Sequence, residues 1–183
     1  MTRAKEKAER KAKAITAKAG RALRVDNETE FHQLFPECDV SLKFTYKRIS
    51  EGEEVECDLF SCACYGIANR QKDDLAKLIV KRMIAEGVDL RVHRTNKFGF
   101  TTLMMAASYC NRALVEIVLP LSDTTATTSD GLTAVQLARG SGLADNASYI
   151  EAFILGKDEA KKIGDDIPIP IPIGGRRRSI DDR

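Results

Sequence analysis

Histidine and cysteine are the side chains that most often supply nucleophilic, acid–base or metal-binding chemistry, and this chain of 183 residues has two histidines and five cysteines. His32 lies in EFHQLF with no partner for catalysis beside it, so we interpret it as a surface or helix-capping residue. His93 is flanked by arginines and precedes Asn96, a setting that favours hydrogen bonding within a loop over metal ligation. Neither histidine is predicted to be catalytic.

The cysteines are odd in number and form no CxxC pair, which argues against a disulfide framework and against a zinc ribbon. Two of them, Cys62 and Cys64, stand two residues apart on a predicted helix, a spacing that points their side chains in different directions. We therefore expect small buried thiols in a reducing, cytosolic-type compartment. The cysteines are Cys38, Cys57, Cys62, Cys64 and Cys110.

Two further motifs are also interpreted as structural. Asp73 and Asp74 begin a predicted helix over 73–86 that stops at Gly87, and one of them is expected to cap it. The G-x-G of ARGSGLAD (138–145) follows a predicted helix, whereas a phosphate-binding loop precedes one. We expect no metal, no cofactor and no catalytic residue. A histidine beside a cysteine in a pocket would be the feature that favours an enzyme instead.

The net charge of +2 hides an uneven distribution. Residues 1–24 carry nine Lys and Arg against Glu6 and Glu9, a net charge of +7. Residues 157–183 have a net charge of +1, so residues 25–156 have a net charge of −6. Alanines recur along 1–24 at helical spacing, but a stripe of single methyl groups buries little surface, so a solvated or transient helix is predicted. Such an arm could contact nucleic-acid phosphates or an anionic membrane surface, or could simply be solvated.

The residues after this arm predict a short β-hairpin. Leu42, Phe44 and Tyr46 alternate with polar neighbours, SEGEE at 50–54 supplies a turn, and the chain is expected to return near Val55. We assign 25–56 to an atypical N-terminal cap. The chain has no run of about 18 apolar residues and no apolar N-terminal stretch. A cytoplasmic protein is expected, with signal-peptide-independent delivery to a host cell as an alternative.

Two segments repeat one pattern at a distance of 32 residues: GFTTLMMA from Gly99 and GLTAVQLA from Gly131 both read G-x-T-x-Φ-x-x-A, where Φ is apolar. Glycine permits the positive φ of a tight turn, and threonine caps the helix that follows. The pattern and its period resemble ankyrin repeats, whose octet is usually G-x-T-P-L-H-x-A. This chain departs from that octet, with Thr102 and Ala134 replacing proline and Met104 and Gln136 replacing histidine.

The resemblance covers about residues 57–155 and implies a mostly α-helical ankyrin solenoid of three degenerate repeats, at 57–94, 95–127 and 128–155. In the first repeat, the sequence alignment places Leu59 at the position of Leu103. The remaining residues, 156–183, form a predicted flexible tail that contains IPIPIPI and RRR. The prolines predict an extended segment there.

The resemblance also implies a protein-binding module, because partners of ankyrin repeats usually contact the turn tips and the inner face of the first helices. Three aromatic side chains at these positions predict an interaction surface, since aromatic residues dominate interface energetics. In the alternative interpretation, Phe98 and Phe100 pack against the first repeat or the cap. A second class of function is a nucleic-acid-associated protein that binds through its basic arm. The partner-binding positions are Lys97, Phe98, Phe100, Ser108, Tyr109, Ser129, Asp130 and Leu132.

Overall fold

The computed structural model describes residues 3–47, 54–70 and 73–165, and the tail segments IPIPIPI and RRR lie outside the described residues. Eight α-helices, two short 3-10 helices and two strands make up this part of the chain. The elements are α1 (Arg3–Arg24), α2 (Glu28–Leu34), η1 (Phe35–Glu37), β1 (Phe44–Lys47), β2 (Glu54–Cys57), α3 (Leu59–Arg70), α4 (Asp73–Ala85), α5 (Thr102–Tyr109), α6 (Arg112–Val118), η2 (Leu119–Leu121), α7 (Ala134–Gly140) and α8 (Ala144–Asp165).

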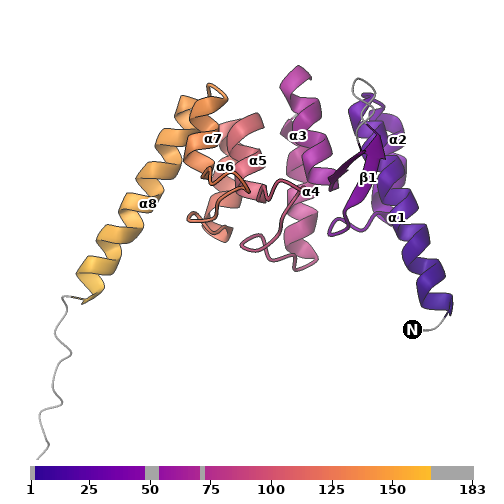
Figure 1. The fold of residues 1–183 in the computed structure, drawn as a ribbon, viewed down its shortest axis with the longest axis horizontal. Helices are drawn as coiled ribbons and strands as arrows, with labels where there is room; N and C mark the ends of the chain where they lie inside the picture. The colour runs from indigo at the N-terminus through magenta and orange to yellow at the C-terminus, as the bar shows by residue number, and fades with distance from the viewer. Residues whose placement is uncertain (1–2, 48–53, 71–72, 166–183) are drawn as a thin grey trace, which may run out of the picture.

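The helices pack in consecutive pairs that follow one another along the molecule (Figure 1). Each of α1, α3, α5 and α7 packs on the helix that follows it in sequence, and successive members of this set contact one another. The second helices of the last three pairs also contact one another in order, α4 with α6 and α6 with α8. One continuous core runs through these pairs, from Ala19 in α1 to Ile150 in α8.

The repeated octets form turns followed by capped helices. Gly99 and Gly131 have φ of +77° and +78°, the left-handed region that glycine adopts at little cost. The hydroxyls of Thr101 and Thr133 accept hydrogen bonds from the backbone N–H three residues on. In return, Met104 Sδ lies 3.4 Å from Thr101 N, and Gln136 Oε1 lies 2.9 Å from Thr133 N. The residues that replace histidine thus complete reciprocal capping boxes.

Thr102, which replaces the usual proline, fits its position poorly. Its Oγ1 is buried and has no hydrogen-bond partner among the described residues. Thr102 is the first residue of α5, where the N–H has no intrahelical acceptor, and Thr101 before it is extended, with φ −86° and ψ 168°. This backbone accepts proline without rearrangement.

Thr102→Pro is therefore expected to raise the free energy of unfolding by about 1 kcal/mol, because it removes an unsatisfied hydroxyl and restricts the unfolded chain. Urea denaturation followed by circular dichroism measures this change. Thr102→Val is the matched control, since it removes the hydroxyl without restricting the backbone. A lower stability for the proline variant than for the valine variant would contradict the expected fit.

The first repeat begins one residue later than the sequence alignment places it. The Asp58 side chain accepts a hydrogen bond from Ser61 N at 2.7 Å, and Cys62 N donates to Asp58 O. These are the bonds that Thr101 and Thr133 make in the later repeats, so Asp58 is their equivalent and Phe60 corresponds to Leu103. An acidic residue replaces threonine as the cap, which concealed the correct frame.

The basic N-terminal segment differs from the solvated helix that its alanine stripe predicts. The second half of α1 is buried against α3, with Thr16, Ala19, Gly20, Ala22 and Leu23 in the interior. The small residues allow close approach: a Cβ on Gly20 would lie 2.2 Å from Cζ of Phe44. A thin stripe therefore suffices where a large aromatic ring of another element fills the space above it.

The predicted hairpin is present as an antiparallel pair of strands, β1 and β2, with Phe44 opposite Cys57 and Tyr46 opposite Val55. Phe44, Val55 and Cys57 are buried, as the alternation indicates. The hairpin lies between the α1–α2 pair and α3 (Figure 1). The last residue of β2, Cys57, makes a β-bridge with Asn96. The hairpin is therefore joined directly to the turn of the first octet.

Candidate protein-binding surface

The turn of the central repeat is held by the buried side chain of Asn96. Its Oδ1 accepts hydrogen bonds from Phe98 N at 3.0 Å and from Phe100 N at 3.3 Å. Below this tip, Thr95 N donates to Phe100 O at 2.7 Å and closes a narrow hairpin. One amide side chain therefore fixes the direction in which the tip presents Phe98.

The next turn has the same construction with a different residue. Thr128 replaces Asn96, and its hydroxyl accepts a hydrogen bond from Leu132 N at 3.2 Å. The two tips are joined directly, because Ser129 N donates to Phe98 O at 3.0 Å. They form one edge of linked turns rather than two independent loops.

This edge exposes apolar side chains. Phe98 is 44% exposed and Leu132 is 40% exposed, although both belong to hydrogen-bonded turns. Lys97 and Asp130 beside them are exposed, and Lys97 Nζ lies 5.2 Å from the centre of the Phe98 ring. The tips thus combine apolar contact area with charges of both signs.

The aromatic positions divide into exposed and packed residues. Phe98 does not pack into the interior, whereas Phe100 is half-buried against the core. The alternative interpretation of the sequence, in which both rings pack against other parts of the chain, therefore fits Phe100 and not Phe98. Ser108 is buried and donates a hydrogen bond to Met104 O at 2.8 Å, so it is not available to a partner in this conformation. Ser129 is exposed, although its hydroxyl donates to Phe98 O.

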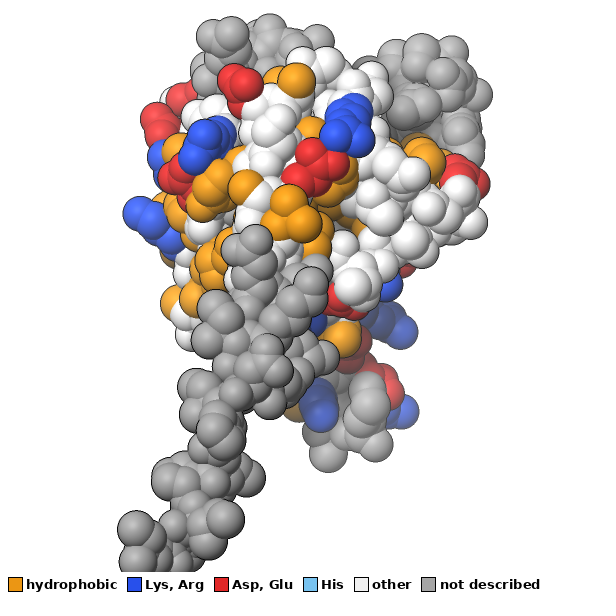
Figure 2. Space-filling view, turned by 90° about the vertical axis from the view of Figure 1, so that its left-hand side faces the viewer, with side chains coloured by type: hydrophobic (Ala, Val, Ile, Leu, Met, Phe, Trp, Pro, Cys, Tyr) orange, Lys and Arg blue, Asp and Glu red, His pale blue; other side chains and the backbone are white. Residues whose placement is uncertain are grey.

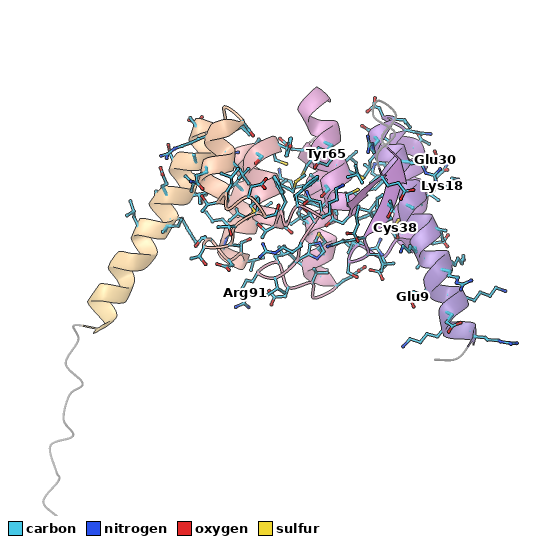
Figure 3. The ribbon with its side chains drawn as sticks, in the orientation of Figure 1. Glu9, Lys18, Glu30, Cys38, Tyr65 and Arg91 are labelled. Atoms are coloured by element: carbon cyan, nitrogen blue, oxygen red, sulfur yellow. The ribbon has the colours of Figure 1, made fainter. Side chains whose placement is uncertain are left out.

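Tyr109 is half-buried and has a neighbour that sequence reasoning missed. Its ring lies 5.3 Å from that of Tyr65 in an edge-to-face arrangement, so two tyrosines from α3 and α5 share one surface. Figure 3 shows Tyr65 on α3, labelled near the middle of the molecule. The alignment did carry a signal for this pair, because placing Leu59 at the position of Leu103 also places Tyr65 at the position of Tyr109.

Comparison with known proteins gives a match to this region. Residues 83–138 match the family model described as ankyrin repeats (many copies). The chain contains ankyrin repeats. A search among curated proteins finds no match to the sequence. The matched range includes both linked tips and the whole of α5 and α6.

A solved structure resembles most of the present chain. This structure is the Bd0816 predatory endopeptidase from Bdellovibrio bacteriovorus in complex with immunity protein Bd3460. The similarity has a TM-score of 0.51 at 20% sequence identity and covers 73% of the present chain. It covers 62% of the other chain, so the present chain spans less than two thirds of that relative's length. At this identity the likeness shows a shared fold.

The α3–α4 helix pair is anchored by a histidine–aspartate pair. His93 Nε2 lies 2.7 Å from Oδ2 of Asp58, whose side chain is fully buried while that of His93 is 10% exposed. The other carboxylate oxygen of Asp58 caps α3 through Ser61 N. His93 therefore makes the hydrogen bond that its loop setting predicts, and the pair ties the start of α3 to the loop before the central tip. His32, in contrast, is exposed and packs edge-on against Phe31.

All five cysteines are free and buried. They form two sulfur contacts, with 3.3 Å between Sγ of Cys57 and Cys62 and 3.5 Å between Sγ of Cys64 and Cys110. The contact with Cys57 and burial raise the pKa of Cys62 well above its usual value, and burial and the contact with Cys110 do the same for Cys64. In the part of the chain that the structure describes, no three metal-ligating side chains gather at one point.

These raised pKa values predict alkaline sensitivity. The unfolded thiols lose protons as the pH rises through 9.0, their usual pKa, whereas the folded thiols of Cys62 and Cys64 keep them. The folded state then binds more protons than the unfolded state, so its stability falls with rising pH above that value. The expected result is a melting temperature that drops from pH 8.5 to pH 10.

A Cys62→Ala/Cys64→Ala variant provides the control, because it should lose part of this decline. A second measurement is the reaction with a disulfide reagent such as 5,5′-dithiobis(2-nitrobenzoate), which needs an accessible thiolate. At pH 8 the native chain should react slowly at all positions and the denatured chain rapidly. Rapid reaction of all five thiols in the native chain would contradict their burial.

Two further features of the surface are a cavity and an apolar end of the molecule. A cavity of about 580 Å³ opens between the loops that follow α4 and α6 and is lined by Ile84, Val88, Leu90 and Leu121 among others. None of the helices in the described ranges is both long and apolar enough to span a membrane. Figure 2 shows that hydrophobic side chains also gather on the end of the molecule that carries α7 and α8.

Proposed function

We propose that this chain is a non-enzymatic interaction module that binds a partner protein through the linked tips of its central and last ankyrin repeats. We also infer that its helix pairs form a short solenoid, with α1, α2 and the β-hairpin as its N-terminal cap. The single observation that supports the binding site most directly is the pair of exposed apolar side chains, Phe98 and Leu132, on tips that are hydrogen-bonded to each other.

Rigidity makes these side chains suited to binding. A surface that is already ordered loses little conformational entropy when a partner binds, so the apolar area that it buries contributes more fully to affinity. Exposed apolar residues at a fixed spacing are also the usual anchors of interfaces, with polar neighbours at the rim. Here Lys97, Ser129 and Asp130 supply that rim, and the tyrosines of α3 and α5 extend the surface. The similar solved structure is itself a complex of two proteins.

Site-specific photocrosslinking tests the proposal. A benzophenone amino acid at position 98 or 132 should capture one partner from source-cell lysate, identified by mass spectrometry. The same amino acid at positions 84 and 121 is the matched control, because Ile84 and Leu121 are 39% and 43% exposed but line the cavity beside the ends of α4 and η2.

Purified partner then gives the quantitative test. Phe98→Ala/Leu132→Ala is expected to weaken its affinity at least 30-fold, as for two central anchors, whereas Ile84→Ala/Leu121→Ala changes it by less than threefold. Circular dichroism first establishes that both variants are folded. Capture from the control positions in preference to the tips, or equal effects of the two double variants, would overturn the proposed site.

A further inference from the structure

The exposed face of α1 is the most strongly charged surface that the partner-binding proposal leaves unused. Between residues 3 and 14 the helix carries six Lys and Arg against two Glu, and nearly all of these residues are exposed. Figure 1 shows this half of α1 extending beyond the neighbouring elements, and Figure 3 shows Glu9 on the same free part of the helix.

The positive side chains form a line on this face. Arg3, Lys7 and Arg10 follow the i, i+4, i+7 spacing that places residues on one side of a helix, and Arg21 continues the same line five turns after Arg3. At 1.5 Å per residue the line is about 27 Å long. Between Arg10 and Arg21 this line passes through Ala14, which is exposed, and Ala17, which packs partly against the core.

The second half of the helix is anchored through its other face. Ala19, Ala22 and Leu23 are in the core, and Thr16 Oγ1 both donates to Ala12 O and accepts from Asp39 N. Ion pairs of Lys11 with Glu37 and of Lys18 with Glu30 hold its flanks to the body. The line of charges therefore belongs to one continuous helix, Arg3–Arg24, whose second half is fixed to the body.

We propose that this face of α1 binds the phosphate backbone of double-stranded nucleic acid. A regular row of cations fits a regular row of phosphates, and their neutralisation releases condensed counterions. Residues 25–156 carry a net charge of −6, so this larger part of the chain repels the same polyanion and orients the molecule with α1 toward it.

A membrane surface fits this face less well. Helices that lie in a lipid interface insert large apolar side chains opposite their basic face. In the projecting half of α1, residues 3–14, the apolar residues are all alanine. The helix therefore supplies charge without an apolar anchor, which suits a polyanion that stays in water.

The test measures binding of the full chain to a fluorescein-labelled 20-base-pair DNA duplex by anisotropy. We expect a Kd of the order of 10 µM at 50 mM NaCl that weakens roughly a hundredfold at 200 mM, as for about four phosphate contacts. Deleting α1 is unsuitable, because it removes core residues. Arg3→Ala/Lys7→Ala/Arg10→Ala changes only exposed side chains and should weaken binding at least tenfold and flatten the salt dependence.

The matched control is Lys77→Ala/Lys81→Ala/Arg91→Ala, which removes the same charge from α4 and the loop after it. This control should stay within about twofold of the unmodified chain. Equal losses in both triple variants would overturn the proposal, since binding would then follow overall charge. It would also be overturned by undetectable binding at 50 mM NaCl, or by tighter binding to polyglutamate or to phosphatidylserine vesicles than to DNA.

Discussion

Replacing Asp58 with alanine is expected to lower the free energy of unfolding by about 3 kcal/mol, which corresponds to a fall in melting temperature of roughly 9 °C. One carboxylate makes two separate bonds in the interior. Oδ1 caps α3 through Ser61 N at 2.7 Å, and Oδ2 lies 2.7 Å from His93 Nε2. Alanine removes the cap and leaves a largely buried imidazole nitrogen without its partner.

Two controls separate these contributions. Thr133→Ala removes a helix cap of the same kind from α7, where the hydroxyl accepts from Gln136 N at 3.3 Å, and should cost about 1 kcal/mol. Asp58→Asn keeps an oxygen for the cap and a polar group toward His93. We therefore expect its loss of unfolding free energy to lie between those of Thr133→Ala and Asp58→Ala. Urea denaturation gives all three values.

A double-mutant cycle with His93→Ala isolates the coupling between the two side chains. We expect a coupling of about 1.5 kcal/mol, typical of a hydrogen bond that involves a charged group. If Asp58→Ala costs no more than Thr133→Ala, the bond to His93 contributes nothing to stability. The pair would then only orient the loop.

The parts of this fold that local chemistry determines could be predicted from the sequence. The G-x-T octets specify a turn at a glycine of positive φ and a helix capped by threonine, and both copies fold in this way. Gly87 ends α4 for the same reason, with φ of +76°. The alternation around Phe44 predicted a strand because every second side chain must reach the core.

The parts that depend on contacts between distant residues could not be predicted. The burial of α1 requires Gly20 to contact the ring of Phe44, and no residue near Gly20 in the sequence indicates that this ring packs there. Asp58 gave no repeat signal because aspartate replaces the threonine of the octet. The role of the binding positions stays a prediction, although the structure divides them into exposed tips and the buried Ser108.

The clearest of these distant contacts joins the N-terminal helices to the first repeat through Arg82. Its guanidinium donates hydrogen bonds to the carbonyl oxygens of Phe35, Pro36 and Cys38 and lies 4.8 Å from the centre of the Phe35 ring. Its Nε also lies 2.6 Å from Oε1 of Glu86, the residue that follows α4. One side chain of α4 thus satisfies the carbonyl groups of η1 and of the turn after it.

Arg82→Ala is expected to cost about 3 kcal/mol, because it leaves these carbonyl oxygens without a donor and removes the contact with Phe35. Arg112 is a matched control. It also pairs with a glutamate four residues on, at 2.9 Å, and lies 4.2 Å from the centre of an aromatic ring, that of Tyr149. Its pair is about half exposed, so Arg112→Ala should cost below 1 kcal/mol.

Hydrogen exchange distinguishes a local effect from general destabilisation. In Arg82→Ala, amides of α2 and η1 should lose protection first, while those of α5 and α6 keep it until global unfolding. Arg82→Lys should restore little, since one ammonium group cannot reach all of the carbonyl oxygens in the geometry of the guanidinium. Equal costs for the two alanine variants, or uniform loss of protection along the chain, would show that Arg82 does not hold the N-terminal helices to the repeats.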